Sequence, residues 1–169
     1  MNKALSIFIG VLISSGAFAQ SDPNLGIIPA PVSVTKNSGT FLLDKTVVLV
    51  HQDADGTKMG DLLNAFIVNK AGFALRESKT AGANQKAIVL TSAGADKLPE
   101  EGYTIKVTPN QIVITGKGAG LFYAVESVMQ MIPEKSGDKI AIPAVLINDY
   151  PRFKYRGTML DVGRHFFPI

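Results

Sequence analysis

The sequence of 169 residues contains no cysteine. This absence excludes disulfide bonds, thiolate zinc sites, cysteine nucleophiles and a lipoprotein anchor, so the fold must depend on its apolar core. A membrane-spanning helix needs about 18 consecutive apolar residues. The apolar run near the N-terminus is interrupted by Ser14, Ser15 and Gly16, and we expect no membrane span once this segment is removed.

A large excess of charge of one sign is also missing. Lysine and arginine number 17 against 14 acidic residues, and the basic residues are scattered along the chain. A nucleic-acid-binding face or a polybasic membrane patch requires a cluster of basic residues. We therefore expect no nucleic-acid partner.

Motifs for several kinds of chemistry are absent. No Gly-x-Ser-x-Gly sequence provides a serine nucleophile, and the glycine-rich residues 116–120 lack the ending and spacing of a phosphate-binding or dinucleotide-binding loop. His51, in a polar loop after a predicted strand, and His165 lie far apart in the sequence, without the short spacing typical of zinc ligands. We predict neither a metal nor a cofactor.

The N-terminus has the pattern of a secretory signal peptide. Lys3 precedes an apolar run over residues 4–13, and the small residues Ala17 and Ala19 occupy the positions that a signal peptidase inspects. The pattern predicts a signal peptide over residues 1–19, cleavage before Gln20 and an exported protein, periplasmic or extracellular.

Two segments have the three- and four-residue apolar spacing of amphipathic helices. The first begins at Thr57 and ends at Gly72, a residue suited to a left-handed helix C-cap. The second follows Gly120 and ends before Pro133, because proline cannot continue helical hydrogen bonding. Their apolar faces contain Met59, Leu62, Leu63, Phe66 and Ile67 in the first helix, and Leu121, Phe122, Val125, Val128, Met129 and Ile132 in the second.

The other patterns predict strands. They comprise a hairpin of residues 32–36 and 40–43, short strands at 46–50, 73–77 and 86–91, a hairpin of 102–107 and 111–115, and an apolar run at 140–147. Strands joined mostly by hairpins, together with two one-sided helices, indicate an α+β fold. We expect a largely antiparallel sheet with both helices packed on one face.

A proline-containing corner at residues 148–151 marks the predicted boundary between a domain at 20–148 and a second unit that begins at 149–169. In the second unit, a strand predicted at 155–162 carries Arg156 near its start and Asp161 near its end. Arg164 and His165 follow in a loop. Charged groups at the carboxyl end of a barrel strand are typical of active sites in (β/α)8 barrels. A structural ion-pair network of Arg156, Asp161 and Arg164 would explain the same pattern.

These residues resemble the entrance to the catalytic (β/α)8 barrel of family 20 glycoside hydrolases, the β-N-acetylhexosaminidases. Arg156-Gly157, Asp161 and Arg164-His165 match the first barrel strand of that family. Glu101-Gly-Tyr103 and residues 120–130 match the accessory domain that precedes the barrel. The resemblance thus implies an accessory domain at 20–148, followed by the start of an incomplete barrel.

The resemblance implies hydrolysis of terminal N-acetylglucosamine or N-acetylgalactosamine from oligosaccharides. The family uses substrate-assisted, retaining catalysis, in which the 2-acetamido group of the sugar replaces a carboxylate nucleophile. The catalytic Asp-Glu pair of the family lies on a later barrel strand, so this chain is expected to be an inactive N-terminal fragment without a catalytic residue. Arg156 matches an arginine that binds sugar hydroxyls, for which a planar guanidinium is suited. Asp161, Arg164 and His165 are expected to shape the site.

Two other hypotheses fit the sequence. One is a stand-alone, non-catalytic carbohydrate-binding or scaffold module. The other is a related hydrolase that shares the accessory domain and has a different chemistry. If the nucleotide sequence downstream encodes an Asp-Glu pair, the hexosaminidase hypothesis is favoured over the stand-alone module.

Export predicts that the mature protein begins at Gln20, because the peptidase cleaves after the small residues Ala17 and Ala19. Mass spectrometry of the exported protein measures its N-terminus directly. A mature chain that still begins at Met1 would contradict the prediction.

Overall fold

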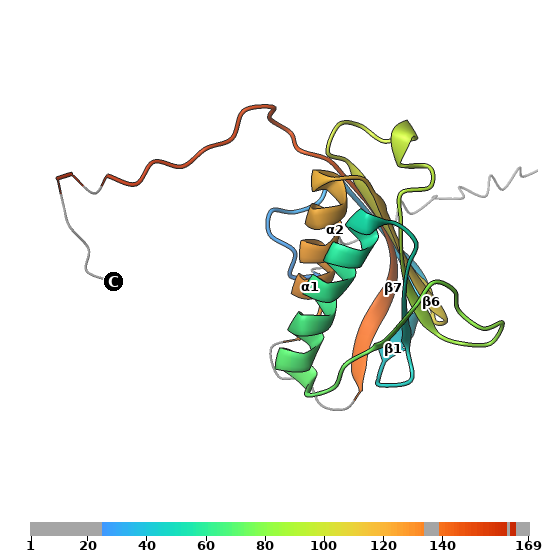
Figure 1. Ribbon diagram of the computed structural model, residues 1–169. Helices are drawn as coiled ribbons and strands as arrows, with labels where there is room; N and C mark the ends of the chain where they lie inside the picture. Colours follow the sequence, from blue (N-terminus) through green and yellow to red (C-terminus); the bar gives the residue numbers. More distant parts are fainter. Residues whose placement is uncertain (1–24, 134–138, 162, 165–169) are drawn as a thin grey trace, which may run out of the picture.

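The computed structural model describes residues 25–133, 139–161 and 163–164, which form one seven-stranded sheet with two helices (Figure 1). The elements are β1 (Ser33–Leu43), β2 (Val48–His51), α1 (Ala54–Ala71), β3 (Arg76–Ser78), β4 (Ala87–Thr91), a 3-10 turn (Ala95–Lys97), β5 (Tyr103–Val107), β6 (Gln111–Gly116), α2 (Ala119–Gln130) and β7 (Ile140–Asp149). No helix in the described ranges combines the length and apolar character needed to cross a membrane.

The sheet is mixed, so the expectation of a largely antiparallel sheet was wrong. The strand order is β1-β7-β5-β6-β4-β2-β3. β3, β2, β4 and β6 are parallel to one another, whereas β5, β7 and β1 pair in antiparallel fashion. The reason lies in the connections, because α1 crosses over between β2 and β3, and such a crossover joins parallel strands.

The hairpin predicted over residues 32–43 is a single bulged strand. Both halves of β1 pair with β7, with Lys36 opposite Val145 and Thr40 opposite Pro143. The turn-like residues between Lys36 and Thr40 form an irregularity in this ladder. Gly39 has φ 104° there, and a Cβ atom would lie 2.7 Å from Cγ of Pro109. Only glycine suits such a bulge.

Both helices lie side by side on one face of the sheet, as predicted (Figure 1). α1 begins earlier than expected because the carboxylate of Asp53 accepts a hydrogen bond from the Gly56 amide and caps the helix. Gly72 ends α1 in the left-handed conformation (φ 75°), as its sequence position predicted. The main core fills the space between the helices and the sheet, where Leu63 of α1 and Leu121 of α2 are fully buried.

His51 was expected in a loop, but it is the last residue of β2 and only 6% exposed. Its Nε2 lies 3.0 Å from Oε2 of Glu77, and its Nδ1 lies 3.0 Å from the hydroxyl of Thr57. The hydrogen bond from His51 is the main reason that the pKa of Glu77 is lowered, with a second contribution from Asn64. The histidine therefore links β2 to β3 and to α1.

The chain after β7 leaves the domain as an extended segment (Figure 1). Its described residues contain no helix or strand, so the barrel strand predicted at 155–162 is not seen over 155–161. Tyr155 and Met159 are 91% and 89% exposed. A strand requires a neighbour to pair its backbone groups, and no strand of the described sheet adjoins this segment.

Candidate functional site

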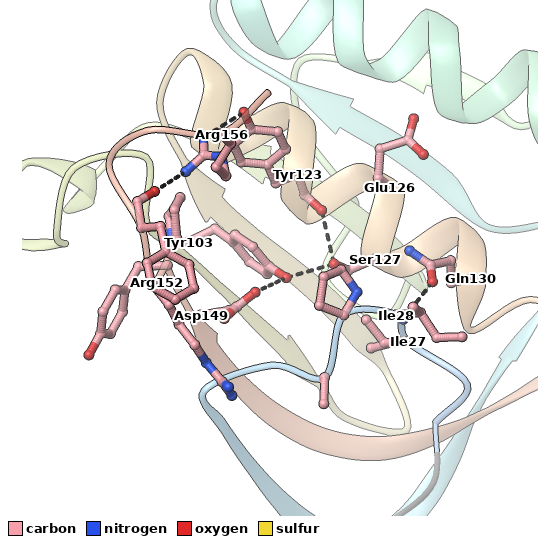
Figure 2. A pocket seen from close by; sticks show the side chains of 15 residues that line it. Ile27, Ile28, Tyr103, Tyr123, Glu126, Ser127, Gln130, Asp149, Arg152 and Arg156 are labelled. Atoms are coloured by element: carbon pink, nitrogen blue, oxygen red, sulfur yellow. Dashed lines mark hydrogen bonds between the residues drawn. The ribbon is translucent and has the colours of Figure 1, made fainter. Parts of the chain in front are cut away.

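A pocket of about 560 Å³ lies where four parts of the domain meet. Its walls come from the lead-in to β1, from α2, from the end of β7 and from the first residues after β7 (Figure 2). This volume is within the range of small-molecule sites. The lining is mostly apolar, with Ile27, Ile28 and Phe153 among its members.

The floor of the pocket is a partly buried hydrogen-bond network around Tyr103 (Figure 2). Its hydroxyl donates to Oδ2 of Asp149 at 2.9 Å and lies 2.6 Å from the hydroxyl of Ser127. The other carboxylate oxygen of Asp149 accepts from the Val32 amide at 3.0 Å. Burial raises the pKa of Tyr103, so the hydroxyl keeps its proton. The network ties β5, α2, β7 and the lead-in together.

Polar side chains line the wall and rim of the pocket. Oε1 of Gln130, at the end of α2, accepts a hydrogen bond from the Ile28 amide at 2.8 Å, which holds the lead-in against the helix. Glu126 of α2 and Arg152 of the segment after β7 are also among the lining residues. An apolar lining with a few convergent polar groups is typical of binding sites.

Arg156 lies at the edge of this pocket and contacts the domain (Figure 2). Its Nη2 donates to the carboxylate of Glu101 and, at 3.3 Å, to the hydroxyl of Tyr123, while its Nη1 donates to the Phe153 carbonyl at 3.0 Å. The guanidinium carbon is 5.8 Å from the centroid of the Tyr123 ring. The hydrogen bond to Glu101 is the largest of the effects that raise the pKa of Arg156.

The other predicted site residues are not gathered around Arg156. Asp161 forms an ion pair with Nε of Arg164 at 3.2 Å and accepts from the amides of Gly163 and Arg164, each at 3.1 Å. No hydrogen bond or ion pair joins Arg156 to Asp161 or Arg164 among the described residues, so the ion-pair network that was the alternative explanation is not seen there, and two separate pairs form instead. His165 lies outside the described residues.

Two features of the site were missed from the sequence. One is the Tyr103 network, and the other is Glu101 as the partner of Arg156. In the sequence, Glu101-Gly-Tyr103 contributes only to the family resemblance, and no local pattern indicates these contacts. The described ranges contain no cluster of three or more His, Cys, Asp or Glu side chains able to hold a metal ion.

Comparison with known proteins identifies the family. Residues 24–150 match the family description "Glycosyl hydrolase family 20, domain 2", and the chain belongs to this family. The chain is 30% identical to a β-hexosaminidase of Porphyromonas gingivalis over 155 residues, which cover 88% of this chain and 20% of that protein. It is 27% identical to a β-N-acetylhexosaminidase of Cellulomonas fimi over 150 residues, covering 87% and 30%. The chain thus spans less than a third of either relative.

Solved structures show the same fold. A family 20 exo-β-N-acetylglucosaminidase from Vibrio harveyi, in complex with N-acetylglucosamine, matches with a TM-score of 0.69 at 26% identity, covering 85% of this chain and 22% of that one. A β-N-acetylhexosaminidase from Streptomyces coelicolor A3(2) matches with a TM-score of 0.70 at 28% identity, covering 85% and 30%. The described domain therefore has the α+β architecture found in family 20 enzymes.

The network predicts that Tyr103→Phe destabilises the domain by about 1–3 kcal/mol, because Asp149 and Ser127 lose a buried hydrogen-bonding partner. Chemical denaturation measures the free energy of unfolding. The matched control is Tyr150→Phe, at a side chain that is 42% exposed, which should change stability by less than about 0.5 kcal/mol. Equal effects of the two substitutions would contradict the role of the network.

Proposed function

We propose that this chain is the N-terminal part of an exported β-N-acetylhexosaminidase, in which it supplies the accessory domain beside a catalytic barrel. The complete enzyme would remove terminal N-acetylglucosamine or N-acetylgalactosamine from oligosaccharides. The observation that carries the proposal is the match of residues 24–150 to domain 2 of the family, in a chain that spans 20% and 30% of two hexosaminidases.

The substrate class is supported by the sugars bound to solved relatives. The Vibrio harveyi enzyme was solved with N-acetylglucosamine, and a mutant β-hexosaminidase of Streptomyces plicatus was solved with the same sugar as product. In a substrate-assisted mechanism, the acetamido oxygen of such a sugar attacks the anomeric carbon while an acid protonates the leaving oxygen. The proposed enzyme would use this mechanism, with its Asp-Glu pair on a later strand of the barrel.

Two residue-level proposals belong to this function. Arg156 would bind hydroxyl groups of the terminal sugar, because a guanidinium presents planar donors able to bridge two oxygens. Asp161, Arg164 and His165 would shape the same site.

Export through the signal peptide at residues 1–19 would place the enzyme in the periplasm or outside the cell, where it would meet oligosaccharides.

Because the proposal assigns the catalytic residues to the barrel, residues 20–169 alone should not turn over a chromogenic N-acetylglucosaminide. The same residues joined to the catalytic barrel of the complete enzyme should turn it over. Release of the chromophore measures both. Turnover by the shorter chain would contradict the proposal. Binding of N-acetylglucosamine to the shorter chain with no activity in the longer one would favour a carbohydrate-binding module, for which the pocket beside Tyr103 offers a site.

The role of Arg156 predicts that Arg156→Lys weakens sugar binding by the complete enzyme roughly 10- to 100-fold. Lysine keeps the charge but loses the paired geometry, and a hydrogen bond to a charged group contributes about 1.5–3 kcal/mol. Steady-state kinetics with an N-acetylglucosaminide measures the effect. Arg76→Lys, in β3 at the far edge of the sheet and outside the pocket lining, is the matched control and should leave KM unchanged. Unchanged kinetics in Arg156→Lys would show that this arginine has a structural role only.

A further inference from the structure

His51 occupies a closely fitted slot between the sheet and α1. The residue ends β2 and is only 6% exposed. Two buried glycines of α1, one turn apart, make room for it. A Cβ on Gly56 would lie 3.2 Å from Cβ of His51, and one on Gly60 would lie 3.2 Å from Cδ2 of the ring. A larger side chain at either position would press on the histidine, so the helix holds the ring in place.

The two ring nitrogens of His51 face different partners. Nε2 lies 3.0 Å from Oε2 of Glu77, and Nδ1 lies 3.0 Å from the hydroxyl oxygen of Thr57. Hydrogen bonds from His51 and, to a smaller extent, from Asn64 lower the pKa of Glu77, so its carboxylate is ionised at neutral pH. An ionised carboxylate only accepts hydrogen bonds. Nε2 of His51 therefore carries a proton.

The hydroxyl of Thr57 has a second acceptor within reach. It donates to the Asp53 carbonyl oxygen at 2.9 Å, and a hydroxyl has only one proton to donate. With a neutral ring, the bare Nδ1 of His51 and the Asp53 carbonyl compete for this proton, and one contact is left unmade. With a charged ring, Nδ1 donates to the Thr57 oxygen while the hydroxyl donates to Asp53. The hydrogen bonds of the site are thus complete only around a doubly protonated ring.

The charged groups that face His51 favour the same form. Glu77 approaches from β3, and Asp53 lies just after β2 as the cap of α1. The pKa of Asp53 is lowered chiefly by the amide hydrogen bond that caps the helix, with a smaller contribution from the charge of Lys79, so this acid is ionised as well. On the other side, β4 places the apolar Leu90 opposite His51. The ring therefore has two negative charges close by.

The contacts of His51 act on a short strand at the edge of the sheet. β3 has three residues and pairs with β2 alone. Side chains provide its other attachments: Asn64 of α1 accepts from the Leu75 amide at 2.7 Å and donates to the Leu75 carbonyl at 3.0 Å, just before β3, and His51 holds Glu77. Local opening concentrates in elements with few buried contacts, so these attachments matter for keeping β3 on the sheet.

We propose that His51 is a pH-sensitive clasp, which fastens β3 to β2 and α1 more tightly when its ring is doubly protonated. A histidine in water changes its charge near pH 6.5. The clasp is therefore closed in mildly acidic conditions and loosens as the pH rises toward 8. Glu77 stays ionised over this window, because its lowered pKa moves the loss of its charge to more acidic pH. The clasp belongs to the domain itself and requires neither sugar nor barrel.

The pH dependence of folding tests the clasp. Urea denaturation of the purified chain at constant ionic strength gives the equilibrium constant for folding at each pH. Glu77→Gln keeps the shape of the partner and removes its charge. The ratio of the wild-type constant to the Glu77→Gln constant should be about 3 to 10 times larger near pH 5.5 than near pH 8, because hydrogen bonds between charged groups are the stronger ones. Dividing the two constants cancels the titration of every other group.

Two controls separate the clasp from a general effect of charge. Glu100→Gln removes the same charge from an exposed residue before β5, and its ratio should be independent of pH. In a His51→Gln background, adding Glu77→Gln should likewise give a ratio that does not depend on pH, because the titrating partner is gone.

Nitrogen-15 NMR of the wild type reports on the ring directly and needs no destabilised variant. The chain, purified without a histidine tag, contains two histidines, so the spectrum of His165→Asn assigns the remaining ring to His51. Near pH 5.5 both of its ring nitrogens should carry protons. Near pH 8 only Nε2 should carry one, since Glu77 still accepts from it.

Either of two results would overturn the clasp. One is a ratio for Glu77→Gln that is the same at both pH values or that changes equally in Glu100→Gln. The other is a His51 ring that stays neutral near pH 5.5 or that carries its single proton on Nδ1. Both measurements use the domain without sugar, so their failure would leave the proposed hexosaminidase function standing. Conversely, failure of the activity assay would leave the ring and the folding constants unchanged.

Discussion

The close approach of α2 to the β5–β6 hairpin is the constraint on which the pocket depends. A Cβ on Gly116 would lie 2.8 Å from the Leu121 amide nitrogen, and one on Gly120 would overlap the Gly102 carbonyl oxygen. Glycine at both positions lets the helix begin directly on the hairpin. Tyr103 consequently lies within hydrogen-bonding distance of Ser127, and the Glu101 carbonyl lies close to Gly120 at the start of α2. One steric condition thus determines both the floor of the pocket and its edge.

The mixed sheet explains why the ends of distant segments converge at this place. β7 lies between β1 and β5, antiparallel to both, so the chain leaves the sheet beside the point where β1 begins. Asp149 occupies this junction, accepting from the Val32 amide and from Tyr103. A carboxylate with several donors is a strong point of attachment. The direction in which the chain leaves the domain is therefore defined by hydrogen bonds as well as by strand pairing.

In the proposed function the domain stands beside a catalytic barrel, and its structure is compatible with that role. It has a complete core of its own, yet it presents an open pocket and an arginine contact at the junction with the next segment.

The sequence by itself determined the elements whose causes are local. The spacing of apolar residues predicted both helices, Gly72 predicted the end of α1, and alternation with a Pro-Asn turn predicted the β5–β6 hairpin, since these depend on neighbouring residues only. Tertiary structure alone decided the parallel pairing of β2, β4 and β6, the bulge at Gly39 and the burial of His51. It also decided that Arg156 meets Glu101 and not Asp161. Such choices depend on contacts between residues far apart in the sequence, and periodicity carries no information about which strand or charge becomes the neighbour.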